Sequence, residues 1–204
     1  MPWWGVVSSA AAPVVLVGGG TVAGRLQPPS YDAVADTVSG LAAVGAVDRW
    51  VMTVTFVLVA VCELLTGLAL RPAGAPGRLI LMAGAMAGML VAASPEHAGG
   101  GSLSHAIWAV VGFTALVAWP AGAWRRGPFV PWALRPASSV GAVAVLLALL
   151  AWFGAELVLG AGQAGVAERI LGAAQAAWPL VVVLSCRHPA RTGAAGTSVL
   201  GPRC

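Results

Sequence analysis

Long apolar stretches alternate with short polar segments along most of the chain. The hydrocarbon core of a membrane is about 30 Å thick, so a helix needs about 20 apolar residues to cross it. Six stretches approach or exceed that length, at residues 3–23, 50–70, 79–94, 105–124, 138–159 and 167–186. They lack the two-residue alternation of barrel strands, and lipid offers no partner for unpaired backbone groups. The pattern predicts an all-α bundle of six transmembrane helices.

The segments between these stretches are short, so the predicted helices account for nearly the whole chain. The segment "RPAGAPGR", residues 71–78, contains proline and glycine residues that end one helix and allow a tight return before the next. We expect a single six-helix membrane domain at residues 1–188 and no soluble domain. Residues 189–204 are expected to form a disordered cytoplasmic tail.

Composition supports a membrane location. Hydrophobic residues make up 59% of the chain and charged residues 9%, whereas about 25% of residues are charged in an ordinary soluble domain. The lipid bilayer is therefore the expected surrounding. The net charge of +4 does not indicate nucleic-acid binding, because basic residues in membrane proteins mainly set orientation. Every basic residue is arginine, which together with abundant alanine, glycine and valine indicates a GC-rich bacterial genome.

The distribution of arginine residues predicts the orientation of the helices. Eight arginines and no acidic residue fall in the second-to-third connection, the fourth-to-fifth connection and the tail: Arg71, Arg78, Arg125, Arg126, Arg135, Arg187, Arg191 and Arg203. The other three connections combine a few arginines with most of the acidic residues. Arginine marks the cytoplasmic side, so both termini are predicted to be cytoplasmic in the cell membrane. The connection between the first two helices then faces outward.

That outward connection contains the polar stretch "QPPSYDAVADTVSG", residues 27–40. Pro28 and Pro29 prevent an earlier helix start, and Ser30 suits an N-cap. Asp32 would fall in the first turn, where the helix dipole favours anions. We predict a short helix at the outer interface, between the first two transmembrane helices.

Polar side chains at the outward helix ends form a candidate pocket. The first outer connection, the start of the fourth stretch and the start of the sixth contribute Tyr31, Asp36, Ser39, His105, Glu168 and Arg169. The three outer connections open on the same face, so these groups share one depth. We expect the polar stretch to fold inward as a lid, with Arg169 close to Asp36 or Glu168. The leading hypothesis is a membrane protein, non-catalytic or not demonstrably catalytic, whose pocket binds a lipid headgroup or a small solute.

A membrane-embedded enzyme is the first alternative. His105 with Asp36 or Glu168 would form an acid–base pair in the same pocket. No HExxH pattern accompanies the histidines, and the three cysteines lack CxxC spacing, so neither a metal site nor a cofactor is expected. Nothing in the sequence identifies a protein partner.

Glu63 supports a second alternative, a small proton-coupled carrier. It lies thirteen residues into the second apolar stretch, and an ionisable group at that depth is costly and commonly functional. It is either a proton or cation site or a protonated carboxyl group bonded to a neighbouring helix. Thr66 and Gln175 are the candidate partners for the structural role.

Four patches give the chain a family resemblance. The run "QPPSYDAVADTVSGLAA" followed by "DRWVMTVTFVLVAVCELLTGLAL" resembles the start of the bacterial membrane proteins grouped as domain of unknown function 998. The patches "SLSHAIWAVVGF" and "GVAERILGAAQAAWPLVVVL" are similar to that family's fourth and last helices. The resemblance covers about residues 10–188 and implies a six-helix architecture without assigning an activity. Ala33 replaces the proline that follows Tyr-Asp in the family pattern.

Overall fold

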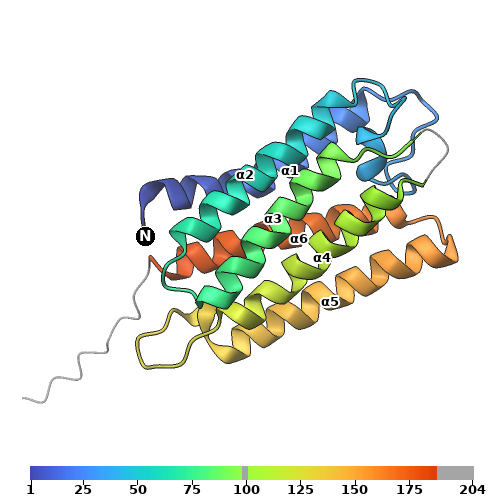
Figure 1. Cartoon of the computed structure of the whole chain (residues 1–204). Coiled ribbons are helices and arrows are strands. Elements are labelled where there is room, and N and C mark those ends of the chain that lie inside the picture. Colours follow the sequence, from blue (N-terminus) through green and yellow to red (C-terminus); the bar gives the residue numbers. More distant parts are fainter. Residues whose placement is uncertain (98–100, 188–204) are drawn as a thin grey trace, which may run out of the picture.

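The computed structural model describes residues 1–97 and 101–187. Within those residues, six helices are long and apolar enough to cross a membrane and no strand is present (Figure 1). They are α1 (Trp3–Arg25), α2 (Trp50–Ala69), α3 (Ala75–Ala93), α4 (Leu103–Ala123), α5 (Pro136–Leu159) and α6 (Ala164–Ser185). The predicted all-α bundle is confirmed, and the chain is a multi-pass membrane protein. The expected tail at residues 189–204 lies outside the described residues.

Helix α3 is longer than the sequence pattern predicted. It begins at Ala75, four residues before the expected start, with Pro76 in its first turn. Proline suits that position because the first helical N–H groups have no partner within the helix. Arg78, the next charged residue, extends back and donates from Nε to the Gly67 carbonyl at 2.8 Å. The proline therefore starts α3 instead of extending the connection, and the arginine caps the end of α2.

The six helices form a closed ring. Each helix packs against the next along the chain, and α6 also packs against α1. Large apolar side chains remain exposed on the outside of the ring, among them Val14, Leu79, Val140 and Val158. An exposed apolar exterior of this kind suits contact with lipid tails.

The two ends of the ring differ in packing. We call the end with the connecting residues 26–49, 94–97, 101–102 and 160–163 the loop end, and the opposite end, with the chain's N-terminus, the tail end. At the tail end, α3 and α4 approach so closely that a Cβ on Gly77 would collide with Ala123. A buried cluster fills this end: Leu70, Ala73, Leu81, Trp119, Ala123, Ala133, Leu134, Val182 and Val183. The helices are therefore tightly packed at the tail end.

A short helix lies between α1 and α2, but not where the sequence placed its start. Residues 31–38 form turns, and a single 3₁₀ turn, η1, follows at Ser39–Ala42. Ser30 therefore caps no helix. The predicted interfacial helix is reduced to η1, whose Leu41 and Ala42 are buried.

Candidate functional site

The turns at residues 31–38 lie across the first turn of α6. The amide of Gly165 donates to the Ala35 carbonyl at 3.2 Å, and that of Val166 donates to the Val34 carbonyl at 3.0 Å. These amides belong to the first turn of α6, where N–H groups have no partner within the helix. The two carbonyls are therefore unavailable for a helix of their own, which explains why the stretch does not coil.

Arg169 strengthens this attachment from one turn further along α6. Its Nη1 donates to the carbonyl oxygens of Ala33 at 2.7 Å and Asp36 at 3.0 Å. The same nitrogen also reaches the Gly165 carbonyl at 2.8 Å, and Nη2 donates to the Tyr31 hydroxyl. The guanidinium group thus binds the backbone of the loop and not, as expected, a carboxylate of Asp36 or Glu168.

Glu168 holds the next part of the same loop. It is 5% exposed, and its Oε2 accepts the amide N–H of Val38 at 2.6 Å. Its Oε1 accepts the Ser39 hydroxyl at 2.6 Å, and the Ser39 amide lies 3.4 Å from Oε2. A carboxylate that accepts several N–H and O–H groups caps the start of η1 as an N-cap side chain would.

Four of the six candidate pocket residues, Tyr31, Ser39, Glu168 and Arg169, therefore lie in one network. The Tyr31 hydroxyl is part of it, and burial raises its pKa above the ordinary value of 10.0, although the positive charge of Arg169 opposes the rise. Most hydrogen bonds of this network join the loop at residues 31–39 to Glu168 and Arg169, and they hold the loop against α6.

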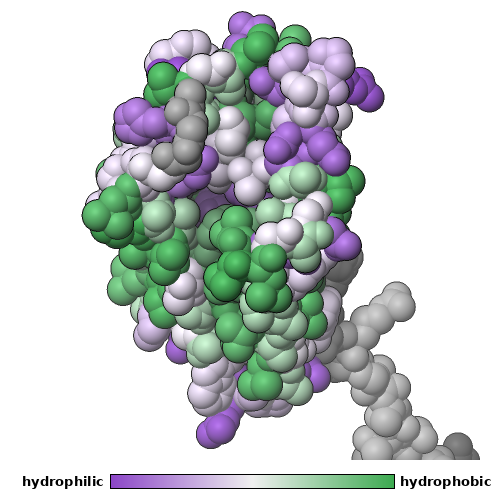
Figure 2. All heavy atoms as spheres, turned by 90° about the vertical axis from the view of Figure 1, so that its right-hand side faces the viewer, coloured by the Kyte–Doolittle hydropathy of each residue, from purple (hydrophilic) through white to green (hydrophobic). Residues whose placement is uncertain are grey.

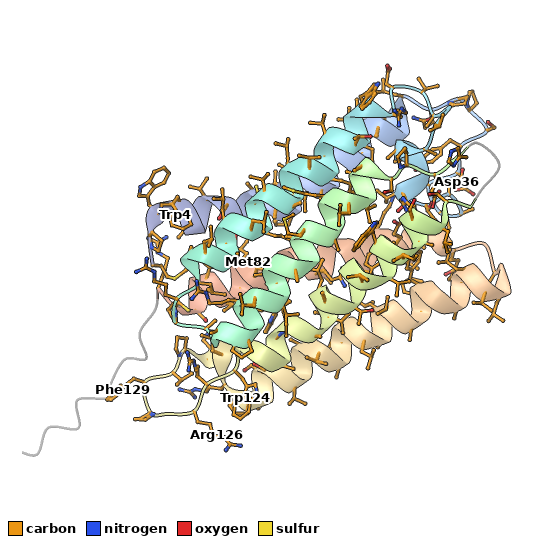
Figure 3. All side chains as sticks on the ribbon, viewed as in Figure 1. Trp4, Asp36, Met82, Trp124, Arg126 and Phe129 are labelled. Atoms are coloured by element: carbon orange, nitrogen blue, oxygen red, sulfur yellow. The ribbon has the colours of Figure 1, made fainter. Side chains whose placement is uncertain are left out.

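Asp36 and His105 are placed differently. The Asp36 side chain is exposed at the loop end (Figure 3), where its Oδ2 accepts the Asp32 amide at 2.8 Å. The His105 ring is buried, with Nδ1 3.0 Å from the Ser94 carbonyl and Nε2 3.4 Å from Glu96 Oε1. His105 thus joins the start of α4 to the preceding loop. Among the described residues, no hydrogen bond connects it with Asp36 or Glu168.

Beneath the docked loop lies a cavity of about 500 Å³ inside the ring. Its walls come from α1, α2, α3, α4 and α6, and Tyr31, Ser39, Glu168 and Arg169 line it near the loop end. Figure 2, which faces the loop end, shows a hollow with hydrophilic side chains around it, above a mostly hydrophobic flank. His105 and Asp36 do not line the cavity. The docked network therefore forms the wall of the cavity at the loop end.

Glu63 and Gln175 lie at the deep end of the same cavity. Glu63 is thirteen residues beyond the start of α2, or about 20 Å along the helix axis. Neither expected partner reaches it: the Thr66 hydroxyl bonds to Ser8 at 2.9 Å, and Gln175 Nε2 donates to the Phe113 carbonyl at 3.1 Å. Glu63 faces the cavity without a hydrogen-bond partner among the described residues.

Sequence reasoning overlooked several residues of this region. Glu96 was not expected to be the partner of His105, and Gly165 was not among the candidate site residues. An added Cβ on Gly165 would collide with the Asp36 carbonyl and lie 2.7 Å from that of Ala33, so only glycine permits the loop to approach. A glycine just before the apolar stretch at residues 167–186 was the available signal, but 27 glycines in the chain obscured it.

Metal binding finds no support in the described part of the chain. No group of three or more histidine, cysteine, aspartate or glutamate side chains is arranged to hold an ion within residues 1–97 and 101–187. The Glu96–His105 pair supplies only two such groups.

Comparison with known proteins gives a family but no activity. No curated protein and no solved structure was found to match the chain. The profile of one family, described as Protein of unknown function (DUF998), matches residues 9–185, which includes most of α1, all of α2 to α6 and the docked loop. On that match, the chain belongs to the DUF998 family of proteins of unknown function.

Proposed function

We propose that the protein binds an amphiphilic ligand, either a membrane lipid or a small solute, in the cavity inside the ring. The observation that carries this proposal is the cavity itself. Its volume of about 500 Å³ falls within the usual range of small-molecule pockets, about 300–1,000 Å³. Its lining is largely apolar with a few polar groups at each end, which suits a molecule with an apolar body and a polar group.

The loop end is proposed to face outward, with both termini cytoplasmic in the cell membrane. Within the described residues, the arginines at the tail end are Arg71, Arg78, Arg125, Arg126, Arg135 and Arg187, with no acidic residue among them. This asymmetry is the one that the positive-inside rule relates to orientation. The ligand would then reach the cavity from the outer leaflet or from outside the cell.

A cavity-filling substitution tests the proposal. Gly88 lines the cavity, and an added Cβ there would meet only Ala60, at 3.9 Å. The longer side chain of Gly88→Leu must therefore extend into the open space. Gly154→Leu is the matched control, because no atom lies within 4 Å of a Cβ at that position. Both variants would be purified with the wild type in mild detergent and analysed by native mass spectrometry for bound lipid.

We expect bound lipid or added amphiphile on the wild type and on Gly154→Leu, and a loss of at least tenfold in occupancy on Gly88→Leu. Equal occupancy on all three proteins would place the bound molecules outside the cavity and overturn the proposal. Thermal unfolding of each variant shows whether Gly88→Leu has retained the fold.

A proton-coupled carrier is the second candidate, and the unpartnered carboxyl group of Glu63 favours it. A carrier would lose gradient-driven uptake of the amphiphile in proteoliposomes when Glu63→Gln is introduced, with the fold intact. If the wild type shows no gradient-driven uptake either, the carrier hypothesis is wrong and the binding proposal remains. The contacts of His105 with Glu96 and Ser94 give the enzyme alternative no comparable support.

A further inference from the structure

Within residues 1–97 and 101–187, Glu63 and Glu168 are the buried carboxylates, and Glu63 differs in having no partner there. It is 3% exposed, and among the described residues no hydrogen bond or ion pair reaches its carboxyl group. Glu168 is almost equally buried, but it accepts three donors from the loop. An unpaired carboxylate at membrane depth is costly unless something binds it. The cavity in front of Glu63 is where such a partner can enter.

The deep end of the cavity offers hydrogen-bond acceptors. Gln175 is 1% exposed, and one N–H of its Nε2 donates to the Phe113 carbonyl, which leaves its side-chain oxygen and the second N–H without a partner among the described residues. That oxygen and the carboxylate of Glu63 both require a donor. The remaining residues nearby, such as Ala60, Gly84 and Leu116, are apolar.

Aromatic side chains and the charges at the loop end favour a positively charged donor. The rings of Tyr31, Phe56, Trp108 and Phe113 line the cavity, and aromatic faces attract cations. The exposed acidic residues Asp32, Asp36 and Asp48 lie at the loop end, where negative charge steers cations inward. Arg25, Arg49 and Arg169 also lie at the loop end, but the acidic residues there, with Glu96 and Glu168 added, outnumber them.

We infer that the ligand is an amphiphile with a protonated amine, and that the amine binds Glu63 and the Gln175 oxygen while the apolar body fills the cavity. This inference rests on the proposed function, since it names the chemical class of the amphiphile. A charge-assisted hydrogen bond between the ammonium group and the carboxylate replaces the partner that Glu63 lacks.

Binding of radiolabelled dodecylamine, compared with dodecanol, tests the inference. Wild type, Glu63→Gln and Glu156→Gln would be placed in phosphatidylcholine nanodiscs. Glu156 is the matched control because it does not line the cavity and already accepts the Trp152 ring N–H and the Gln163 amide. We expect saturable dodecylamine binding to wild type and Glu156→Gln, and at least tenfold weaker binding to Glu63→Gln. Dodecanol should bind all three proteins equally.

Two results would separate failure of this inference from failure of the proposed function. If dodecanol or a copurified lipid occupies the cavity, but dodecylamine binds Glu63→Gln as tightly as wild type, the amine specificity is wrong and amphiphile binding stands. If neither probe binds saturably and Gly88→Leu changes no lipid occupancy, both proposals fail.

A measurement on the wild type alone covers the case in which Glu63→Gln does not fold. Dicyclohexylcarbodiimide is an apolar reagent that modifies buried carboxyl groups, and peptide mass spectrometry locates the adduct. Saturating dodecylamine should protect Glu63 from modification at least tenfold, whereas dodecanol should protect it less. Equal modification with and without dodecylamine would overturn the inference.

Changing the lipid of the nanodisc distinguishes two sources of the amine, a membrane aminolipid and a free hydrophobic amine. A membrane aminolipid as the natural ligand would weaken dodecylamine binding when phosphatidylethanolamine replaces part of the phosphatidylcholine. A free hydrophobic amine as the natural ligand would leave dodecylamine binding unchanged by that replacement.

Discussion

Arg169 lies at the loop end of the cavity, yet its donors are directed at the chain itself. Four acceptors on the loop and on α6 take the hydrogen bonds of its two terminal nitrogens. Both hydrogens of Nη1 and one of Nη2 are engaged in this way, which leaves Nε and the second Nη2 hydrogen for other acceptors. The carboxyl group of Glu63, by contrast, has no hydrogen-bond partner in the part of the chain that the structure describes, and it faces the cavity. At the scale of single residues, a polar side chain whose hydrogen bonds go to the chain itself, such as Arg169, has a structural role. A buried polar side chain without such bonds, such as Glu63, is a candidate for contact with a ligand.

Tyr31 provides a pH test of this network, because it is the only tyrosine in the chain. Burial raises the pKa of its hydroxyl above 10.0, so the folded protein keeps the proton at a pH where the unfolded chain releases it. The stability that Tyr31 contributes is thus fully present below pH 10 and is lost as the pH rises through the folded pKa. We expect tyrosinate absorbance in the folded protein to develop with a midpoint above pH 10.0.

The control for this titration is the protein unfolded in denaturant, whose midpoint should return to about 10. A folded midpoint at or below that of the unfolded chain would mean that Tyr31 is not buried against Arg169. Tyr31→Phe identifies the signal, because it should remove the absorbance change altogether.

At the scale of elements, the loop at residues 31–38 and the start of α6 determine each other's structure. Local signals predicted a helix from Ser30, but the structure satisfies the carbonyls of residues 33–36 with donors from α6. Those donors are about 130 residues away in the sequence, so no local pattern could have revealed them. The membrane helices were predictable because lipid requires every backbone group in a span to be paired within it.

Gly165→Ala tests the contact between these two elements. The added methyl group would collide with the Asp36 carbonyl, so the loop must move away from α6. We expect a loss of about 1–3 kcal/mol in stability, measured by thermal unfolding, and faster hydrogen exchange at the amides of residues 165 and 166. Gly154→Ala, whose Cβ meets no atom within 4 Å, should be neutral or stabilising by up to about 1 kcal/mol. Similar effects of the two variants would contradict the close docking of the loop.

At the scale of the whole molecule, the order of helices in the ring determines which side chains lie at the loop end, and this part of the candidate site could be predicted from the sequence. The prediction placed Tyr31, Ser39, Glu168 and Arg169 at one end, and in the structure Ser39 contacts Glu168 and Tyr31 contacts Arg169. It could not separate them from His105, because His105 lies at the same end but turns its ring toward Ser94 and Glu96. The cavity was not predicted to extend to Glu63, because its depth depends on how five helices pack.

Orientation of the ring in the membrane gives a prediction for the whole chain. The arginine-rich tail end should remain in the cytoplasm, because basic residues resist translocation. Alkaline phosphatase fused after Gly162 should therefore be active in a bacterial host, and green fluorescent protein fused after Arg187 should fluoresce. The opposite pattern would reverse the orientation and place the cavity mouth inside the cell.

Contact between α6 and α1 also has a consequence for the order of events during synthesis. Tyr31 and Arg169 are separated by 138 residues, which a ribosome needs on the order of 10 s to add at roughly 5–20 residues per second. Until α6 emerges, the nascent chain has helices α1 to α5 but neither the last wall of the cavity nor the donors that hold the loop. Newly inserted chains should therefore pass through a stage with the carboxyl group of Glu63 open to the surrounding lipid. A chain that stops before Ala164 would remain at that stage, as a target for membrane quality-control proteases.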